Sequence, residues 1–458
     1  MTNRYANKKI VVVGAGKSGL ALCRFFARRN ARVILSDIRQ RADIGDLSDL
    51  SGCDVAFDLG GHNPELFRKA DLIVLSPGVP PTIAPVQAAV EQGVDLSGEV
   101  EIASRELTAP MIGITGTNGK STVTALVGEA LKACGAKTYV GGNIGTPLTE
   151  AVDQEELEWL VIELSSFQLE TVTSFRPRYS MLLNISADHL DRYPDMRAYI
   201  EAKKKIFSCQ TAADFMILNA DDKLVMEAAV GAPARVVCFS CNSKLDEGMF
   251  LDDDHIVWRW QGTEQTFAVK ELRLKGLHNI ANVMAACIPL LLEGYQAETI
   301  WPAMTRFTGL PHRMNLVRSL DGVEWYNDSK GTNIGSVIMS LAGLDAPVTL
   351  IAGGRDKGGD FGELSGPVKE KVAHLILIGE ATERMATEIG PVTDISKVDS
   401  LDAAVVRARE LTRPGGTVLL SPGCSSFDQF ANFAVRGERF CELVEQLEDG
   451  KAVSNGTP

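Results

Sequence analysis

The segment from Gly116 to Thr122, GTNGKST, places glycines, a lysine and hydroxyl side chains between an apolar run and an amphipathic run. Glycines let a backbone approach a phosphate closely, and the N–H groups at the start of a helix favour an anion. Lys120 can neutralise phosphate oxygens, and the Ser121 hydroxyl can bind Mg²⁺. The strict pattern G-x-x-x-x-G-K-[ST] is not met, because Ile114 stands where its first glycine belongs. The segment still predicts a phosphate-binding loop, with a plain strand-to-helix turn and a solvated Lys120 as the alternative.

Side chains suited to a metal ion stand at the ends of two further apolar runs. Glu163 ends WLVIE, and Asp188 and His189 follow YSMLLNIS. Open α/β sheets bind ligands outside the carboxyl ends of their strands, and a carboxylate there can hold Mg²⁺. The alternatives are a Glu163 carboxylate that is satisfied by Ser165 or Ser166, and a histidine with a structural role only.

Parallel strands are needed to bring these positions together, and the chain begins a strand–turn–helix–strand pattern three times. The first begins at KKIVVVGAGKSG, the second at APMIGITGTNGKST and the third after TGLPHRM. Such alternation predicts an α/β fold of mostly parallel sheets covered by helices. We predict three domains, each large enough for its own core: a Rossmann-like N-terminal domain (1–97), a P-loop ATPase-type central domain (98–307) and a Rossmann-like C-terminal domain (308–458).

Local patterns also predict individual elements. They place a strand over 10–13, a helix that follows it to about Arg29, a strand that ends at Asp37, and a strand over 71–78. A further helix is predicted over 278–294, and a frayed tail over 449–458.

Composition limits the classes of function. The 458-residue chain is 45% hydrophobic and has a formal charge of −13, from 46 Lys and Arg against 59 Asp and Glu. This argues against a nucleic-acid partner, because such proteins are usually basic. No apolar run approaches the roughly 18 residues of a membrane span, and the N-terminus lacks a signal-peptide pattern. Nine scattered cysteines fit reduced thiols, so we expect a cytoplasmic protein without a membrane partner.

Several motifs in order resemble the ATP-dependent Mur ligases of peptidoglycan synthesis, a family that also includes folylpolyglutamate synthases. GTNGKST, ELSSFQLE, NISADHLDRY and HNIANV fit the ATPase domain of that family. In the third unit, NDSKGTN, PHR, GGRDKGGDF and SPGCSSFDQFANFAVRGERF resemble the members that add D-glutamate. A DNPR-like motif, expected of the diaminopimelate-adding relatives, is missing from the sequence.

The resemblance implies an ADP-forming amide ligase of the EC 6.3.2 type. Such an enzyme would phosphorylate the carboxylate of UDP-N-acetylmuramoyl-L-alanine with ATP, and the amine of D-glutamate would then attack the acyl phosphate. The product serves cell wall biogenesis, and through it cell shape and cell division. The third domain would close over the second to exclude water, and the protein is expected to be a monomer.

The resemblance also implies roles for particular residues of the central reaction. Catalysis is expected from Lys120, His189 and Lys203, and two Mg²⁺ ions are expected on Ser121, Glu163, His189 and Lys203. Lys203, in YIEAKKKIF, would be carbamylated by CO₂, which requires a neutral amine; the residues alone are typical of a solvated helix face. The expected ATP-binding residues are Gly116, Thr117, Asn118, Gly119, Lys120, Ser121, Thr122, Asn279, Asn282, Arg313 and Asp328.

The two remaining substrates have their own expected residues. D-Glutamate is expected at Lys330, Thr332, Lys357, Ser426 and Phe433. The UDP-linked substrate is expected at Lys17, Ser18, Asp37, Arg39, Gly78 and Asn143, although a structural turn is the alternative for Asn143. Because GAGKSG also matches G-x-G-x-x-G and Asp37 ends the second strand, these residues alone would also suit NAD.

Two other functions remain open from the sequence. One is a related ligase that adds another amino acid or acts on a folate-type substrate. The other is a nucleotide- or NAD-binding sensor without catalysis, which the joint presence of the predicted catalytic residues disfavours.

Overall fold

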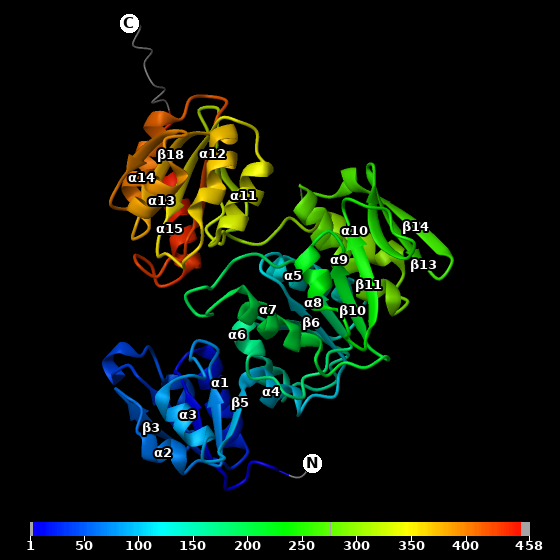
Figure 1. The fold of residues 1–458 in the computed structure, drawn as a ribbon, viewed down its shortest axis with the longest axis vertical. Helices are drawn as coiled ribbons and strands as arrows, with labels where there is room; N and C mark the ends of the chain where they lie inside the picture. Colours follow the sequence, from blue (N-terminus) through cyan, green and yellow to red (C-terminus); the bar gives the residue numbers. More distant parts are fainter. Residues whose placement is uncertain (1–2, 275, 450–458) are drawn as a thin grey trace, which may run out of the picture.

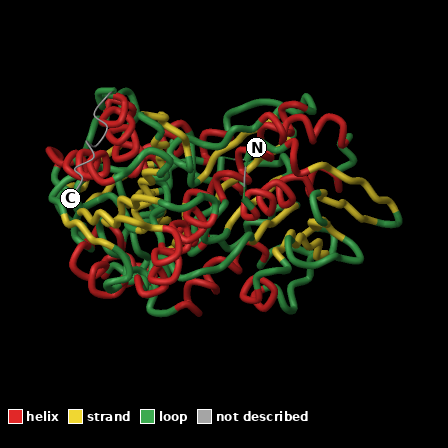
Figure 2. Tube along the Cα trace, turned by 90° about the horizontal axis from the view of Figure 1, so that it is seen from above, coloured by secondary structure: helices red, strands yellow, loops and turns green. Residues whose placement is uncertain are grey.

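The computed structural model describes residues 3–274 and 276–449 and contains three α/β domains, each with its own sheet. Figure 1 shows the first domain in blue and the third in yellow to red at opposite ends of the long axis, with the middle domain between them. Helices lie on both sides of the strands (Figure 2). The predicted α/β class with mostly parallel sheets is confirmed, whereas the exact domain boundaries stay predictions.

The first domain is a fully parallel five-stranded sheet in the order β3-β2-β1-β4-β5, which is the Rossmann strand order without its sixth strand. The strand order reverses beside β1, so the segments after β1 and β4 lie next to each other at the carboxyl edge. Its elements are β1 (Lys9–Val13), α1 (Lys17–Arg28), β2 (Arg32–Asp37), β3 (Val55–Leu59), α2 (Pro64–Arg68), β4 (Leu72–Leu75), α3 (Ala84–Val90) and β5 (Asp95–Gly98).

The middle domain has a nine-stranded sheet in the order β14-β13-β12-β11-β10-β9-β6-β8-β7. Its strands are β6 (Met111–Thr115), β7 (Thr138–Gly142), β8 (Trp159–Glu163), β9 (Tyr179–Leu182), β10 (Phe215–Asn219), β11 (Arg235–Ser240), β12 (Gly248–Asp252), β13 (His255–Trp260) and β14 (Thr263–Ala268). Its helices are α4 (Glu99–Ser104), α5 (Lys120–Ala133), α6 (Ser166–Leu169), α7 (Met196–Lys204), α8 (Lys223–Ala228), α9 (Leu277–Leu292) and α10 (Ala297–Arg306).

The third domain has a six-stranded sheet in the order β15-β16-β20-β17-β18-β19. Its strands are β15 (Asn315–Leu320), β16 (Val323–Asn327), β17 (Val348–Gly353), β18 (Val372–Ile378), β19 (Asp394–Lys397) and β20 (Thr417–Gly423). Its helices are α11 (Ile334–Ala342), α12 (Ser365–Lys371), α13 (Thr382–Ile389), α14 (Leu401–Leu411) and α15 (Phe433–Glu445). Apart from Asp449, the predicted tail lies outside the described residues.

Two antiparallel additions were not predicted. β12, β13 and β14 form a meander at one edge of the middle sheet, and β15 pairs antiparallel with β16. Short turns with positive φ make these connections, at Asp253, at Gln261–Gly262 and at Asp321–Gly322. Such turns match the right-handed twist of neighbouring strands, so the QG and DG pairs in the sequence were the available signal.

Helix α5 holds the phosphate-binding loop against the core of the middle domain. Val123, Leu126, Val127, Ala130 and Leu131 recur at helical spacing and are all buried. They belong to one cluster with the apolar face of α9. The start of α5 is therefore fixed by packing along the whole helix, and the loop before it has a rigid support.

One carboxyl group is buried where the first domain meets the middle domain. Glu99 Oε1 accepts hydrogen bonds from Thr149 N at 2.6 Å and Thr149 Oγ1 at 3.0 Å. No described residue is a hydrogen-bond partner of Glu99 Oε2. Burial raises the pKa of Glu99 to about 7.

We expect Glu99→Gln to change how the free energy of unfolding depends on pH. The folded protein holds the Glu99 proton more tightly than the unfolded chain, so stability is lost as the pH rises from the model-peptide pKa of 4.5 to about 7. Between about pH 5.5 and about pH 8, the wild type should lose about 2 kcal/mol relative to the glutamine variant. Urea unfolding of both proteins at both pH values measures this difference, and equal pH dependences would contradict the assignment.

Among the residues that the structure describes, no helix has both the length and the apolar character needed to cross a membrane.

Candidate functional site

The loop between β6 and α5 binds the side-chain nitrogens of two lysines. Lys120 Nζ donates to Gly116 O at 2.9 Å and to Thr117 O at 2.7 Å. Lys203 Nζ, on α7, donates to the same Gly116 O at 2.7 Å. Lys120 is therefore held by the loop and is only partly exposed, whereas phosphate binding by the loop stays a prediction.

Backbone geometry at the end of this loop requires glycine. Gly119 has a φ of +84°, and a Cβ atom there would lie 2.4 Å from Asn282 Oδ1. A side chain would thus be strained by its backbone and would collide with α9. On the other side of the loop, Asn118 N donates to Asn184 Oδ1 at 2.7 Å, and Asn184 Nδ2 donates back to Asn118 O at 3.0 Å. The conformation of the loop is therefore held from both flanks.

Lys203 faces the interior and not the solvent. Its residue is 1% exposed, and its Nζ lies 4.6 Å from the centre of the Tyr199 ring. Burial, and then the positive charge of Lys120, lower the pKa of Lys203 well below its ordinary value. Its neighbour Lys204 points outward and pairs with Glu201. The solvated-face alternative is therefore wrong for Lys203, and its amine has the tendency to be neutral that carbamylation requires.

Glu163, at the end of β8, lies beside these lysines. Its residue is 1% exposed, and Oε1 accepts a hydrogen bond from Asn143 Nδ2 at 2.7 Å. Its Oε2 is buried and has no hydrogen-bond partner among the described residues. Ser165 instead caps α6 through Gln168, so the serine alternative for Glu163 is not what the structure contains.

The donors of the predicted metal set fit Mg²⁺ in kind. The unpartnered oxygen of Glu163 and the hydroxyl of Ser121 are hard oxygen ligands. Burial lowers the pKa of His189 to about 4 against the opposing charge of Asp188, so its imidazole is neutral at neutral pH, as a metal ligand must be. Within the described residues, no three His, Cys, Asp or Glu side chains gather as a metal cluster. The predicted set contains only two side chains of these types, because its other members are a hydroxyl and a modified lysine.

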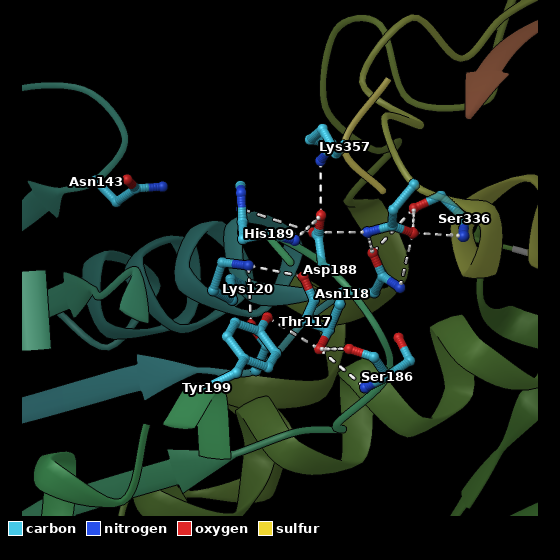
Figure 3. Close-up of polar contacts among 12 residues, drawn as sticks. Thr117, Asn118, Lys120, Asn143, Ser186, Asp188, His189, Tyr199, Ser336 and Lys357 are labelled. Atoms are coloured by element: carbon cyan, nitrogen blue, oxygen red, sulfur yellow. Dashed lines mark hydrogen bonds and ion pairs between the residues drawn. The ribbon is translucent and has the colours of Figure 1, made fainter. Parts of the chain in front are cut away.

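The third domain reaches across to this centre with two lysines. Lys330 Nζ donates to Ser121 Oγ at 2.7 Å and lies 5.2 Å from the centre of the Phe433 ring. Lys357 Nζ donates to Asp188 Oδ1 at 2.7 Å (Figure 3). Burial would raise the pKa of Asp188, but the charge of Lys357 overrides it and holds that pKa at about 2. The structure therefore brings the predicted amino-acid site against the predicted phosphate site.

Three amide and hydroxyl side chains complete a second contact between these domains, which we call the amide latch: Asn118, Asn333 and Ser336. Asn333 Nδ2 donates to Asn118 Oδ1 at 3.1 Å and to Asp188 Oδ2 at 3.1 Å. Ser336 Oγ donates to Asn118 Oδ1 at 2.9 Å (Figure 3). The sequence analysis missed Asn333 and Ser336; the available signal was an asparagine at the N-cap position of α11 within NDSKGTN.

We expect Asn333→Ser to weaken closure of the third domain without unfolding α11. Serine can still cap the helix, but it is too short to reach both Asn118 and Asp188. The KM for the amino acid expected at the third domain should rise about 10-fold, because part of its binding free energy must then bring the middle and third domains together. Small-angle scattering with an ATP analogue and both substrates should show a larger radius of gyration. Asn63→Ser, at the N-cap of α2, is the matched control, and identical behaviour of the two variants would contradict the latch.

A cavity of about 770 Å³ lies beside the loop, between the middle and third domains. Its wall includes Phe239 and Leu277 as apolar surfaces. Two buried polar atoms on it, Thr122 Oγ1 and Arg313 Nε, have no hydrogen-bond partner among the described residues. A mostly apolar cleft of this size with a few convergent polar groups is typical of a small-molecule site.

Most of the predicted nucleotide-binding residues line this cavity: Asn118, Gly119, Thr122, Asn279, Asn282 and Arg313. Asp328 does not. Its carboxylate is buried behind the wall and accepts hydrogen bonds from Ser340 Oγ at 2.7 Å and Ser421 Oγ at 2.8 Å. Its predicted contact with the nucleotide stays a prediction, and in this structure Asp328 supports the wall through Ser340.

The predicted D-glutamate residues lie on neighbouring segments of the third domain. Lys330 and Phe433 are in contact, as described above. An antiparallel bridge joins Arg355 to Ser425, so that the segments that carry Lys357 and Ser426 are held together. Thr332 is half-buried on the segment between Lys330 and the amide latch.

The predicted UDP residues are divided between two places. Lys17, Ser18, Asp37, Arg39 and Gly78 all lie at the carboxyl edge of the first sheet, after β1, β2 and β4. Asp37 accepts a hydrogen bond from Ala15 N at 2.7 Å and pairs with Arg39. It therefore holds the glycine-rich turn in place, whichever ligand binds there. Asn143 lies apart from this edge, in the middle domain beside Glu163.

Comparison with known proteins agrees with this three-domain architecture. The chain matches the Mur ligase MurD-like N-terminal domain over residues 8–98, the Mur ligase middle domain over 114–290 and the Mur ligase glutamate ligase domain over 312–424. The protein belongs to the Mur ligase family.

Within that family, its curated relatives are UDP-N-acetylmuramoylalanine–D-glutamate ligases. That of Syntrophotalea carbinolica is 54% identical, with 97% of this chain and 99% of the relative covered. That of Geotalea uraniireducens is 52% identical, with 97% and 98% covered. In fold, the chain is similar to UDP-N-acetylmuramate-alanine ligase from Thermotoga maritima, with a TM-score of 0.61, 18% identity, and 96% and 99% of the two chains covered.

Proposed function

We propose that this protein is an ATP-dependent ligase that joins D-glutamate to UDP-N-acetylmuramoyl-L-alanine and releases ADP and phosphate. The observation that carries the proposal is the composite centre, in which Lys330 of the third domain contacts Ser121 of the predicted phosphate-binding loop and Lys357 contacts Asp188. Relatives that are 54% and 52% identical over 97% of this chain, and whose names state that activity, support the proposal. The reaction belongs to peptidoglycan precursor synthesis, and we propose that it takes place in the cytoplasm on a monomeric enzyme.

The first step forms an acyl phosphate. An oxygen of the muramoyl-alanine carboxylate attacks the γ-phosphorus of ATP, and the bond to the ADP oxygen breaks. Two anions must approach each other, so the work of the protein is positioning and neutralisation of charge. Lys120, at the start of α5, supplies positive charge at the loop, and Arg313 and the cavity wall orient the nucleotide.

The second step forms the amide. The amine of D-glutamate attacks the acyl carbon, the carbon–oxygen bond to phosphate breaks, and the amine releases a proton. From the third domain, Lys330 faces Ser121 of the loop and Lys357 faces Asp188, where cations suit the carboxylates of the amino acid. Ser121, Glu163, His189 and carbamylated Lys203 are the residues that we propose to hold Mg²⁺, which would supply positive charge to neutralise the phosphate.

The proposal is tested by phosphate release from ATP and Mg²⁺ with UDP-N-acetylmuramoyl-L-alanine in the presence or absence of D-glutamate. We expect sustained release only when both substrates are present. A panel of L-glutamate, D-alanine, diaminopimelate and L-lysine should support little release, because the proposed site recognises two carboxylates in one stereochemistry. Equal release with L-glutamate, or release that does not depend on any amino acid, would overturn the proposal.

A further inference from the structure

The segment that carries Lys357 has an irregular backbone. It runs from the end of β17 at Gly353 to the short turn that begins at Phe361, and no helix or strand covers it. Gly358, directly after Lys357, has a φ of +78°. The segment makes few backbone contacts: Arg355 bridges Ser425, and Gly358 N donates to Asp356 Oδ1 at 2.8 Å. Side chains from other elements therefore contribute to its position.

Arg384, on α13, binds this segment on both sides of Lys357. Its Nη1 donates to Asp356 Oδ2 and its Nη2 donates to Gly359 O, both at 2.5 Å. The guanidinium carbon also lies 5.0 Å from the centre of the Phe361 ring. One planar side chain therefore contacts residues before and after the lysine, which suits the fixed geometry of the guanidinium group.

Glu388, one turn further along α13, orients the arginine and binds the end of the same segment. Its Oε1 accepts a hydrogen bond from Arg384 Nε at 2.6 Å, and its Oε2 accepts one from Phe361 N at 2.9 Å. The Arg384 side chain is 38% exposed and that of Glu388 is 29% exposed, so the pair is only partly shielded from solvent. Its main effect is therefore expected on the position of the segment and not on global stability.

We propose that Arg384, oriented by Glu388, is a positioning residue for Lys357. Arg384 keeps the Lys357 side chain next to Asp188, where Lys357 meets the incoming amino acid. The identity of that amino acid as D-glutamate rests on the proposed function, whereas the contacts of Arg384 with the residues before and after Lys357 do not. Within the described part of the chain, the hydrogen bonds and the ring contact of Arg384 go to Asp356, Gly359, Glu388 and Phe361, none of which is a predicted substrate-binding residue. It acts through Lys357 and is not itself a catalytic residue.

The test compares Arg384→Ala and Arg384→Lys with Arg439→Ala, which removes a similar surface arginine that pairs with Asp402 and Glu442. In Arg384→Ala, the KM for D-glutamate should rise about 10-fold while kcat and the KM for ATP change by less than about 3-fold. The KM for D-glutamate of Arg384→Lys should be intermediate, because lysine can keep one of the contacts of Arg384. Arg439→Ala should have the KM of the wild type.

Two readouts do not need activity. Hydrogen exchange of residues 355–361 should become faster in Arg384→Ala. An amine-specific reagent should also label Lys357 faster in this variant, because the Lys357 side chain is only 13% exposed in the wild type. Unchanged exchange and labelling, or a loosened segment with a wild-type KM for D-glutamate, would each overturn the positioning role. Failure of the proposed function would give a different result. The wild type would then show no D-glutamate-dependent phosphate release, but Arg384→Ala would still differ from the wild type in hydrogen exchange and in labelling of Lys357.

Discussion

Lys120→Ala is expected to lower kcat by about 10³-fold or more and to leave the fold intact. Loss of one preorganised group that stabilises developing charge typically costs about 10²–10³-fold, and a phosphoryl transfer depends on such groups almost entirely. In this structure the Lys120 ammonium is held by Gly116 O and Thr117 O, at the start of a helix that packs along its whole length. Water cannot replace a cation that is fixed in this position.

Steady-state phosphate release with both substrates at saturation measures this loss, and circular dichroism and thermal unfolding report on the fold. Lys132→Ala is the matched control, because Lys132 lies in the last turn of the same helix and is exposed. We expect that variant to keep wild-type activity. If Lys120→Ala kept more than about one tenth of the wild-type kcat, the loop would not act as the phosphate site.

Lys203→Ala is expected to be nearly inactive, with a loss of about 10²–10³-fold in kcat. Lys203 is buried against Gly116 O and the Tyr199 ring, and burial together with Lys120 lowers its pKa, so its amine can react with CO₂. The resulting carbamate would place an anionic oxygen donor where the unmodified side chain has only an amine nitrogen. Truncation to alanine removes that donor and leaves space behind it.

Small carboxylic acids should therefore restore part of the activity of Lys203→Ala, because they can supply an anionic oxygen in the vacated space. Formate and acetate titrations of that variant, beside the same titrations of wild type, measure the rescue. Lys204→Ala is the matched control, since Lys204 is the next residue of the helix but pairs with Glu201 at the surface. Full activity of Lys203→Ala without any added acid would remove the carbamate from the mechanism.

Much of the fold and part of the site were predictable because they depend on local patterns. The glycines and Lys120 of GTNGKST, and the acid that ends WLVIE, lie close to a strand end in the sequence, so parallel pairing brings them to one edge. The antiparallel meander of β12–β14 was missed because its short turns were not read as hairpins, although QG at Gln261 signalled one of them.

The sequence by itself determined the α/β class, the three units, the position of the strand-to-helix loop at GTNGKST and, through a resemblance, the family. These depend on the period of apolar residues and on spacing within a motif, which act over a few residues. Only the tertiary structure decided that Lys203 points inward while Lys204 points outward. It also decided that Asn333 and Lys330 meet the loop, and Lys357 meets Asp188, from another domain. Burial and contacts between distant segments depend on how whole domains pack, and a sequence pattern carries no information on that packing.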